Sequence, residues 1–184
     1  VTGEDRRLLT ELFGERERYV DLLTGMRAAL DDADALTVCA GSGLEEALPG
    51  GIDAAVAAAR AAGVVVLALG EPQRYSGEAQ SRVSITLPPA QQALADAVVA
   101  SGTPVVVLLR HGRALALEGG VRDAAAIAAC WFLGSQTGPA TADVLFGGYN
   151  PSARLPLSFP QHSGQQPYFY AHPRSGRPEL PGVT

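Results

Sequence analysis

The sequence contains no lysine, and all 14 of its basic residues are arginines. A Schiff base on a lysine and a P-loop, which needs a lysine beside the phosphates, are therefore excluded within this chain. The two cysteines, Cys39 and Cys130, show neither CxxC spacing nor a nearby histidine, which argues against a disulfide or a metal pair. We expect both cysteines to be small buried hydrophobes in separate strands.

Several common catalytic signatures are also missing. The Gly-Ser-Gly at residues 41–43 lacks the spacing of a nucleophile elbow, and Glu46 stands where a dinucleotide-binding loop has its third glycine. The three histidines, His111, His162 and His172, are too dispersed for a recognisable metal motif and are more typical of structural or surface positions. We therefore predict neither a cofactor nor a metal.

Strong charge and long apolar runs are absent as well. The net charge is −5 and the arginines are dispersed, which argues against binding to nucleic acid. No apolar run approaches the roughly 20 residues of a membrane span. With 184 residues, 47% hydrophobic and 18% charged, the chain suits one globular domain with a sizeable core rather than a disordered segment. We expect neither nucleic acid nor a membrane as a partner.

Helical and strand-like segments alternate along the chain. We expect helices at residues 4–13, 18–30, 52–62, 89–101 and 137–146, and strands at 35–39, 64–69, 105–109 and 124–131. This alternation predicts an α/β fold, a three-layer α/β/α sandwich with a mostly parallel sheet. The usual opening strand is missing, so we expect a truncated first strand and a piece of a longer protein. We assign residues 1–160 to the sandwich domain and 161–184 to an extended tail.

The most informative segment is the loop at residues 70–82, GEPQRYSGEAQSR, which follows an aliphatic run typical of a strand buried on both faces. Open α/β folds place their chemistry in loops at the carboxyl ends of such strands. The loop combines Glu71 and Glu78 with two arginines and a tyrosine. Taken alone, it also fits a solvated loop whose charges pair locally.

Two further loops, at residues 111–113 and 132–138, follow other predicted strands and should gather at the same edge of a parallel sheet. Together the three loops supply carboxylates, arginines, a histidine and aromatic side chains, without a Ser-His-Asp set. Carboxylates near aromatic rings suit carbohydrate chemistry, in which a carboxylic acid protonates the glycosidic oxygen.

Specific motifs extend this hypothesis. They are GE-x-Q-x-x-SGEA-x-SR at residues 70–82 with ITLP at 85–88, SGTPVVVLL-x-x-GR at 101–113, W-F-x-G at 131–134, ADVLFG-x-YNPS-x-x-LPLSFP at 142–160, and GQ-x-PYFY-x-H-x-x-SGRP at 164–178. In this order they resemble the C-terminal α/β-sandwich domain of glycoside hydrolase family 3, the bacterial β-glucosidase type. The chain departs from the usual family residues at His111, Gln136, Thr137, Gly148, Ala153 and Ala171.

The resemblance implies an active site to which two domains contribute catalytic residues. In the family, a (β/α)8 barrel, absent from this chain, supplies an aspartate nucleophile, and the sandwich domain supplies the general acid/base glutamate. Glu78, in SGEA, corresponds to that glutamate. The implied reaction is hydrolysis of a terminal β-linked glucoside or xyloside with retention of configuration. The implied partners are the β-glycoside substrate and the barrel, and residues 161–184 would pack between the domains.

The same resemblance suggests roles for other residues. Glu71 would orient the loop or hold the domain interface, and Gln73 and Arg82 would shape the loop. Tyr75 is the better candidate for stacking on a sugar, whereas Trp131 is more typical of a core or interface residue.

Two other functions stay open. One is a non-catalytic carbohydrate-binding or scaffolding domain of the same fold, against which the complete SGEA motif counts. The other is a nucleotide-binding α/β domain, which the missing glycine-rich phosphate loop disfavours. If the family assignment holds, the 184 residues alone should be catalytically silent, because the nucleophile lies in the barrel.

Overall fold

The structure, a computed structural model, describes residues 19–171 and residue 173. The helix predicted at residues 4–13 lies outside the described residues. The chain divides into two compact units. One combines the described residues up to Val38 with Phe132–Ala153, and the other combines Cys39–Trp131 with the described residues from Arg154 onward. The loop at residues 70–82 belongs to the second unit.

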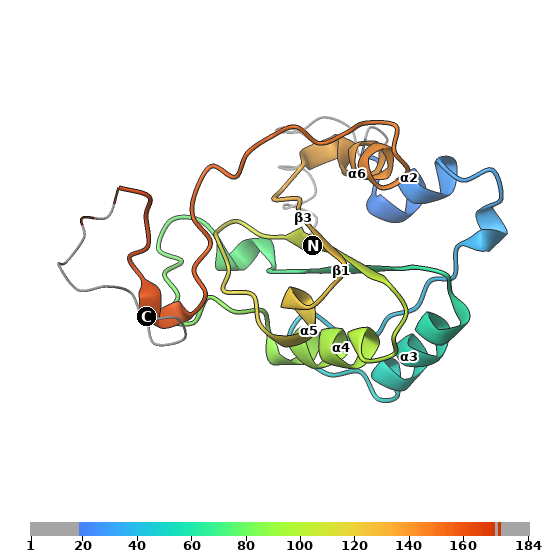
Figure 1. Cartoon of the computed structure of the whole chain (residues 1–184), viewed down its shortest axis with the longest axis horizontal. Coiled ribbons are helices and arrows are strands. Elements are labelled where there is room, and N and C mark those ends of the chain that lie inside the picture. Colours follow the sequence, from blue (N-terminus) through green and yellow to red (C-terminus); the bar gives the residue numbers. More distant parts are fainter. Residues whose placement is uncertain (1–18, 172, 174–184) are drawn as a thin grey trace, which may run out of the picture. The chain divides into compact units, whose positions relative to one another are not determined.

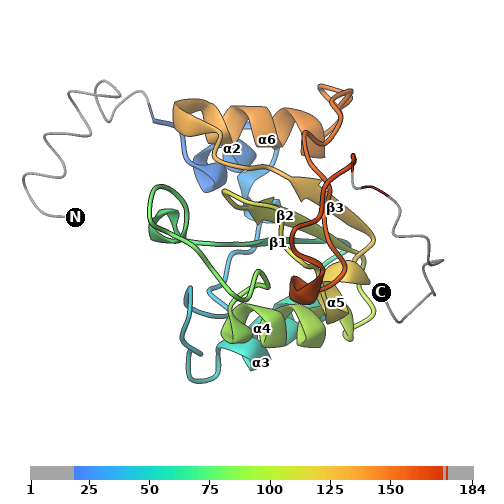
Figure 2. The same ribbon diagram turned by 90° about the vertical axis from the view of Figure 1, so that its left-hand side faces the viewer.

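The second unit is built on a parallel three-stranded sheet, shown in Figures 1 and 2. The strands are β1 (Val65–Gly70), β2 (Val105–Arg110) and β3 (Ala126–Ala129), in the order β1-β2-β3. Val65 lies opposite Val105, so β1 and β2 pair along their whole length. The predicted α/β class with a parallel sheet is confirmed.

Three helices of this unit cover one face of the sheet, below it in Figures 1 and 2. They are α3 (Gly51–Ala61), α4 (Pro89–Val99) and α5 (Gly119–Arg122). Pro89 occupies the first turn of α4, where the missing N–H has no helical partner to lose. Buried aliphatic side chains fill the space between helices and sheet, among them Leu67, Leu69, Leu94, Val98, Val107, Leu109, Leu115 and Val121. This core fixes the strand ends from which the candidate site is built.

The first unit contains two helices, α2 (Leu22–Ala28) and α6 (Thr137–Leu145), which pack against each other. They approach so closely that a Cβ atom on Gly25 would overlap the backbone of Gly138. The helix predicted at residues 18–30 begins only at Leu22 because the Asp21 carboxylate caps it.

The segment before the sheet does not follow the prediction. After the short 3-10 helix η2 (Ala33–Ala35), residues 36–40 form no strand, and Val38 and Cys39 are exposed. A strand needs a neighbouring backbone that accepts and donates its hydrogen bonds, and none of the described strands pairs with this segment. The prediction of a strand at 35–39 is therefore wrong. The cysteine prediction is also wrong, because Cys39 is exposed and Cys130 is half-buried just after β3.

The remaining described segments are short. Three further 3-10 helices are η3 (Gln73–Tyr75), η4 (Gly134–Gln136) and η5 (Ser163–Gln165). Ser163 ties the C-terminal segment to the rest of the second unit, since its hydroxyl accepts a hydrogen bond from the Ile85 N–H at 3.1 Å. Within the part of the chain that the structure describes, no helix is both long and apolar enough to cross a membrane.

Candidate functional site

The site begins where β1 ends, and the backbone there is held from two sides. The Gln91 side chain, buried on α4, accepts a hydrogen bond from the Gly70 N–H at 2.8 Å and donates one to the Gly70 carbonyl at 2.9 Å. The next N–H, that of Glu71, donates to the Arg110 carbonyl of β2 at 2.9 Å. A Cβ on Gly70 would overlap that carbonyl, so only glycine fits. The loop therefore leaves the sheet at a fixed point.

Glu71 is the first side chain of the loop, and its carboxylate is fully buried between two arginines. Its Oε2 lies 3.4 Å from Nε of Arg113, and its Oε1 lies 3.8 Å from Nε of Arg82. Burial raises the pKa of Glu71, and the charges of Arg113 and Arg82 oppose that rise. Glu71 thus faces two cations and not solvent.

Arg113, which follows β2, continues this network into the loop backbone. Its Nη2 donates hydrogen bonds to the carbonyls of Tyr75 and of Gln80, the latter at 2.9 Å. Arg82 contributes from within the loop, because its guanidinium carbon lies 3.8 Å from the centroid of the Tyr75 ring. The loop is therefore bound at several points between residues 71 and 82.

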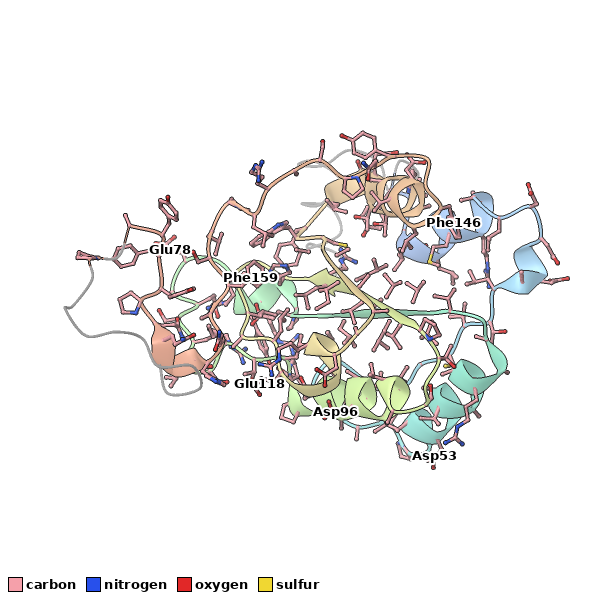
Figure 3. The ribbon with its side chains drawn as sticks, in the orientation of Figure 1. Asp53, Glu78, Asp96, Glu118, Phe146 and Phe159 are labelled. Atoms are coloured by element: carbon pink, nitrogen blue, oxygen red, sulfur yellow. The ribbon has the colours of Figure 1, made fainter. Side chains whose placement is uncertain are left out.

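Glu78 lies between these anchored points and is exposed. Both of its neighbours have left-handed backbone angles, with φ of 125° at Gly77 and 60° at Ala79. Such a conformation costs a non-glycine residue about 1–2 kcal/mol, so the surrounding contacts must stabilise it at Ala79. Figure 3 shows Glu78 towards the carboxyl end of β1, at the opposite end of the unit from Asp53 of α3. The turn thus presents a carboxylate to solvent beyond the sheet edge.

The other predicted site residues occupy two places. Gln73 and Tyr75 begin and end η3, and Tyr75 is half-buried under Arg82. Trp131 has φ of 52° and packs on His111, with 4.2 Å between the ring centroids. The structure therefore brings Glu71, Tyr75 and Arg82 together, while Trp131 belongs to a separate aromatic cluster.

That aromatic cluster is made of His111, Trp131 and Phe159. Phe159, labelled in Figure 3, lies edge-on to His111 with 5.6 Å between centroids. His111 is fully buried, and its Nδ1 lies 2.6 Å from the Arg113 carbonyl. Because a carbonyl only accepts, Nδ1 carries the proton, which leaves Nε2 as an acceptor. The cluster fixes the backbone of the same arginine that binds the loop.

Comparison with known proteins identifies the chain. Residues 8–181 match the family model described as the glycosyl hydrolase family 3 C-terminal domain. The chain belongs to glycosyl hydrolase family 3. The predicted resemblance is confirmed.

Relatives of this family 3 domain are named as glycosidases. It is 50% identical over 130 residues to a periplasmic β-glucosidase of Salmonella typhimurium, covering 71% of the chain and 17% of that protein. It is 30% identical over 164 residues to a β-xylosidase of Formosa agariphila, covering 89% of the chain and 23% of that protein. A crystal structure of the Listeria innocua β-glucosidase in complex with glucose superposes with a TM-score of 0.82 at 39% identity, over 91% of the chain and 23% of that protein. The family 3 domain thus spans less than a quarter of these relatives.

Two residues of the family 3 domain were predicted only as members of the loop at residues 111–113, without a functional role of their own. Arg113 and His111 both follow β2, the strand adjacent to β1, and this position was the available signal. His111 was interpreted as a structural or surface histidine, and the structure shows a buried structural one. The third predicted loop, residues 132–138, belongs to the other compact unit.

The burial of His111 predicts a pH dependence of stability. Burial lowers the pKa of His111, and the hydrogen bond to the Arg113 carbonyl only partly opposes this. The unfolded state therefore binds the proton more readily. The contribution of the neutral, buried His111 to the free energy of unfolding is fully present above the ordinary histidine pKa of about 6.5. Below that pH it declines by at most about 1.4 kcal/mol per pH unit. Urea unfolding between about pH 7.5 and 5.5 should show this slope, and it should be reduced in His111→Gln.

The matched control is His162→Gln, since His162 is exposed. This variant should keep the slope of the wild type. An unchanged slope in His111→Gln would show that His111 does not contribute to the pH dependence.

Proposed function

We propose that this chain is part of a retaining β-glycosidase, of β-glucosidase or β-xylosidase type, in which Glu78 is the general acid/base. One observation carries the proposal: an exposed carboxylate within the SGEA motif stands on a loop whose backbone is anchored at the carboxyl end of β1. Membership of family 3 and relatives named β-glucosidase and β-xylosidase support the reaction class.

The proposed reaction needs a second carboxylate from outside the chain. As the resemblance implies, an aspartate of a (β/α)8 barrel attacks the anomeric carbon while the Glu78 carboxylic acid protonates the departing glycosidic oxygen. Glu78, now a carboxylate, then removes a proton from the water that hydrolyses the glycosyl-enzyme. The chain spans 17% and 23% of two relatives, which leaves room for such a domain in the full-length protein.

Glu78 suits the acid/base role better than Glu71. Glu71 is fully buried and paired with Arg82 and Arg113, so it would have to break both ion pairs to reach a substrate. Glu78 is exposed and stands beyond the sheet edge. We assign Glu71 to orienting the loop and Glu78 to proton transfer.

Sugar-binding roles follow from the same arrangement. Tyr75, half-buried within the acid/base loop, is the proposed stacking residue for a sugar ring. Gln73 and Arg82 would shape the loop around it. Trp131 is the weaker stacking candidate, because it packs in the aromatic cluster with His111 and Phe159 and does not belong to the acid/base loop.

The stereochemistry of the reaction tests this function. The full-length protein, incubated with aryl β-glucosides and β-xylosides, should release the β-anomer of the sugar first, as followed by proton NMR before mutarotation. The 184-residue chain alone should show no turnover, because the proposed nucleophile is an aspartate of the barrel. Initial release of the α-anomer would contradict retention, and turnover by the 184 residues alone would contradict the shared site. Failure of the full-length protein to cleave any of these glycosides would favour the non-catalytic domain.

A further inference from the structure

Arg113 joins the two ends of the segment that carries Glu78. Its Nη2 donates to the Tyr75 carbonyl on one side and to the Gln80 carbonyl on the other. We propose that Arg113 is a positioning residue, which holds Glu78 in place from the neighbouring strand β2. The proposal rests on the proposed acid/base role of Glu78.

Arg113 is itself held at two points. Its Nε lies 3.4 Å from the buried Glu71 carboxylate, and its carbonyl accepts the hydrogen bond of the buried His111 ring. Glu71 is in turn bound to β2 through the Arg110 carbonyl. A guanidinium is planar and offers donors in several fixed directions, so one side chain can pair with a carboxylate and bind two carbonyls together. Lysine, with a single nitrogen on a flexible stem, lacks this geometry.

The backbone around Glu78 shows why the two hydrogen bonds from Arg113 are needed. Gly77 and Ala79 both have left-handed φ angles, and alanine rarely adopts that conformation without support. Without the two hydrogen bonds from Arg113, the segment is free to relax and to move the carboxylate. A displacement of about 1 Å can cost about 10²-fold in rate. Because Arg113 bonds the loop backbone, the loss should fall on protonation of the leaving group.

The test is the dependence of kcat/KM on the leaving group, measured with Arg113→Gln in the full-length protein and a series of aryl β-glucosides. For phenyl and methoxyphenyl glucosides, which need protonation, kcat/KM should fall about 10- to 100-fold. For the 2,4-dinitrophenyl glucoside, whose phenolate leaves without a proton, it should fall by no more than about threefold. The ratio of the two losses does not depend on the fraction of active enzyme. Arg60→Gln, an exposed change on α3, should leave the whole series unchanged.

An equal loss of kcat/KM for every leaving group in Arg113→Gln would overturn the proposal, because Arg113 would then serve the fold alone. The absence of any loss would overturn it as well. If Arg113→Gln does not fold, Arg113→Lys, which keeps the charge beside Glu71, should show the same steeper dependence. Glu78→Gly, measured in parallel, distinguishes a failure of the acid/base role of Glu78 from a failure of the positioning role of Arg113. If Glu78→Gly loses kcat/KM equally for every leaving group, the proposed function itself is contradicted. If the loss in Glu78→Gly is larger for poor leaving groups but the loss in Arg113→Gln is equal for all of them, only the positioning role is contradicted.

Discussion

Replacement of Glu78 by glycine in the full-length protein should lower kcat/KM for aryl β-glucosides with poor leaving groups by about 10²–10⁴-fold. The loss arises because no acid then protonates the glycosidic oxygen as the bond breaks. Formation of the glycosyl-enzyme from the 2,4-dinitrophenyl glucoside should be far less affected, since its leaving group needs no proton. Steady-state kinetics across the series measures the difference.

The control for this change is Glu118→Gln, which removes an exposed carboxylate at the start of α5. It should retain wild-type kinetics with every substrate. Near-wild-type activity of Glu78→Gly with poor leaving groups would mean that another carboxyl group supplies the proton. Glu71 would then be the next candidate, and the loop would have to open to release it from Arg82 and Arg113.

Replacement of Glu71 by leucine should lower the free energy of unfolding by about 3 kcal/mol. Removal of one partner from a buried ion pair leaves the other charge uncompensated, and here two arginines lose their shared carboxylate. The arginine side chains are 25% and 22% exposed, so water can partly solvate them, which places the cost at the lower end of the range for buried pairs. Urea unfolding of the full-length protein at neutral pH measures the change.

A second ion pair provides the comparison. Glu45 and Arg74 are 3.0 Å apart, closer than either contact of Glu71, but their side chains are 43% and 59% exposed. Glu45→Gln should therefore cost less than about 1 kcal/mol, because solvent screens the exposed pair. Equal effects of Glu71→Leu and Glu45→Gln would show that burial does not strengthen the Glu71 contacts, and would contradict the anchoring role of Glu71.

The sheet and its covering helices could be predicted because their residues carry local signals. The aliphatic runs at residues 65–69 of β1 and 105–109 of β2 contain no polar residue and therefore favour strands of a parallel sheet, although Ala68 of β1 is exposed. The run at residues 35–39 looks similar but forms no strand, because a local pattern does not reveal whether a neighbouring backbone is available to pair with it. The predicted strand at residues 124–131 shows the same limit. It ends at Ala129, and Trp131, two residues later, has a left-handed backbone.

The candidate site could be predicted only as far as its loops, at residues 70–82 and 111–113, and not in the contacts between them. Glu71, Tyr75, Glu78 and Arg82 are close in sequence, and their grouping after a buried strand indicated a functional loop. The contact between Arg113 and the Tyr75 carbonyl joins residues 38 positions apart. This contact depends on the register of β1 and β2 and on the direction of the Arg113 side chain. The sequence of the loop at residues 70–82 indicates neither.

The most direct test of the acid/base role is the product that Glu78→Gly forms from the 2,4-dinitrophenyl β-glucoside in the presence of azide. In this variant the glycosyl-enzyme should accumulate, because no base activates water. Azide needs no base, so it should restore turnover and yield the β-glucosyl azide, identifiable by NMR. Azide that neither accelerates the variant nor appears in the product would contradict the assignment of Glu78 as the general acid/base.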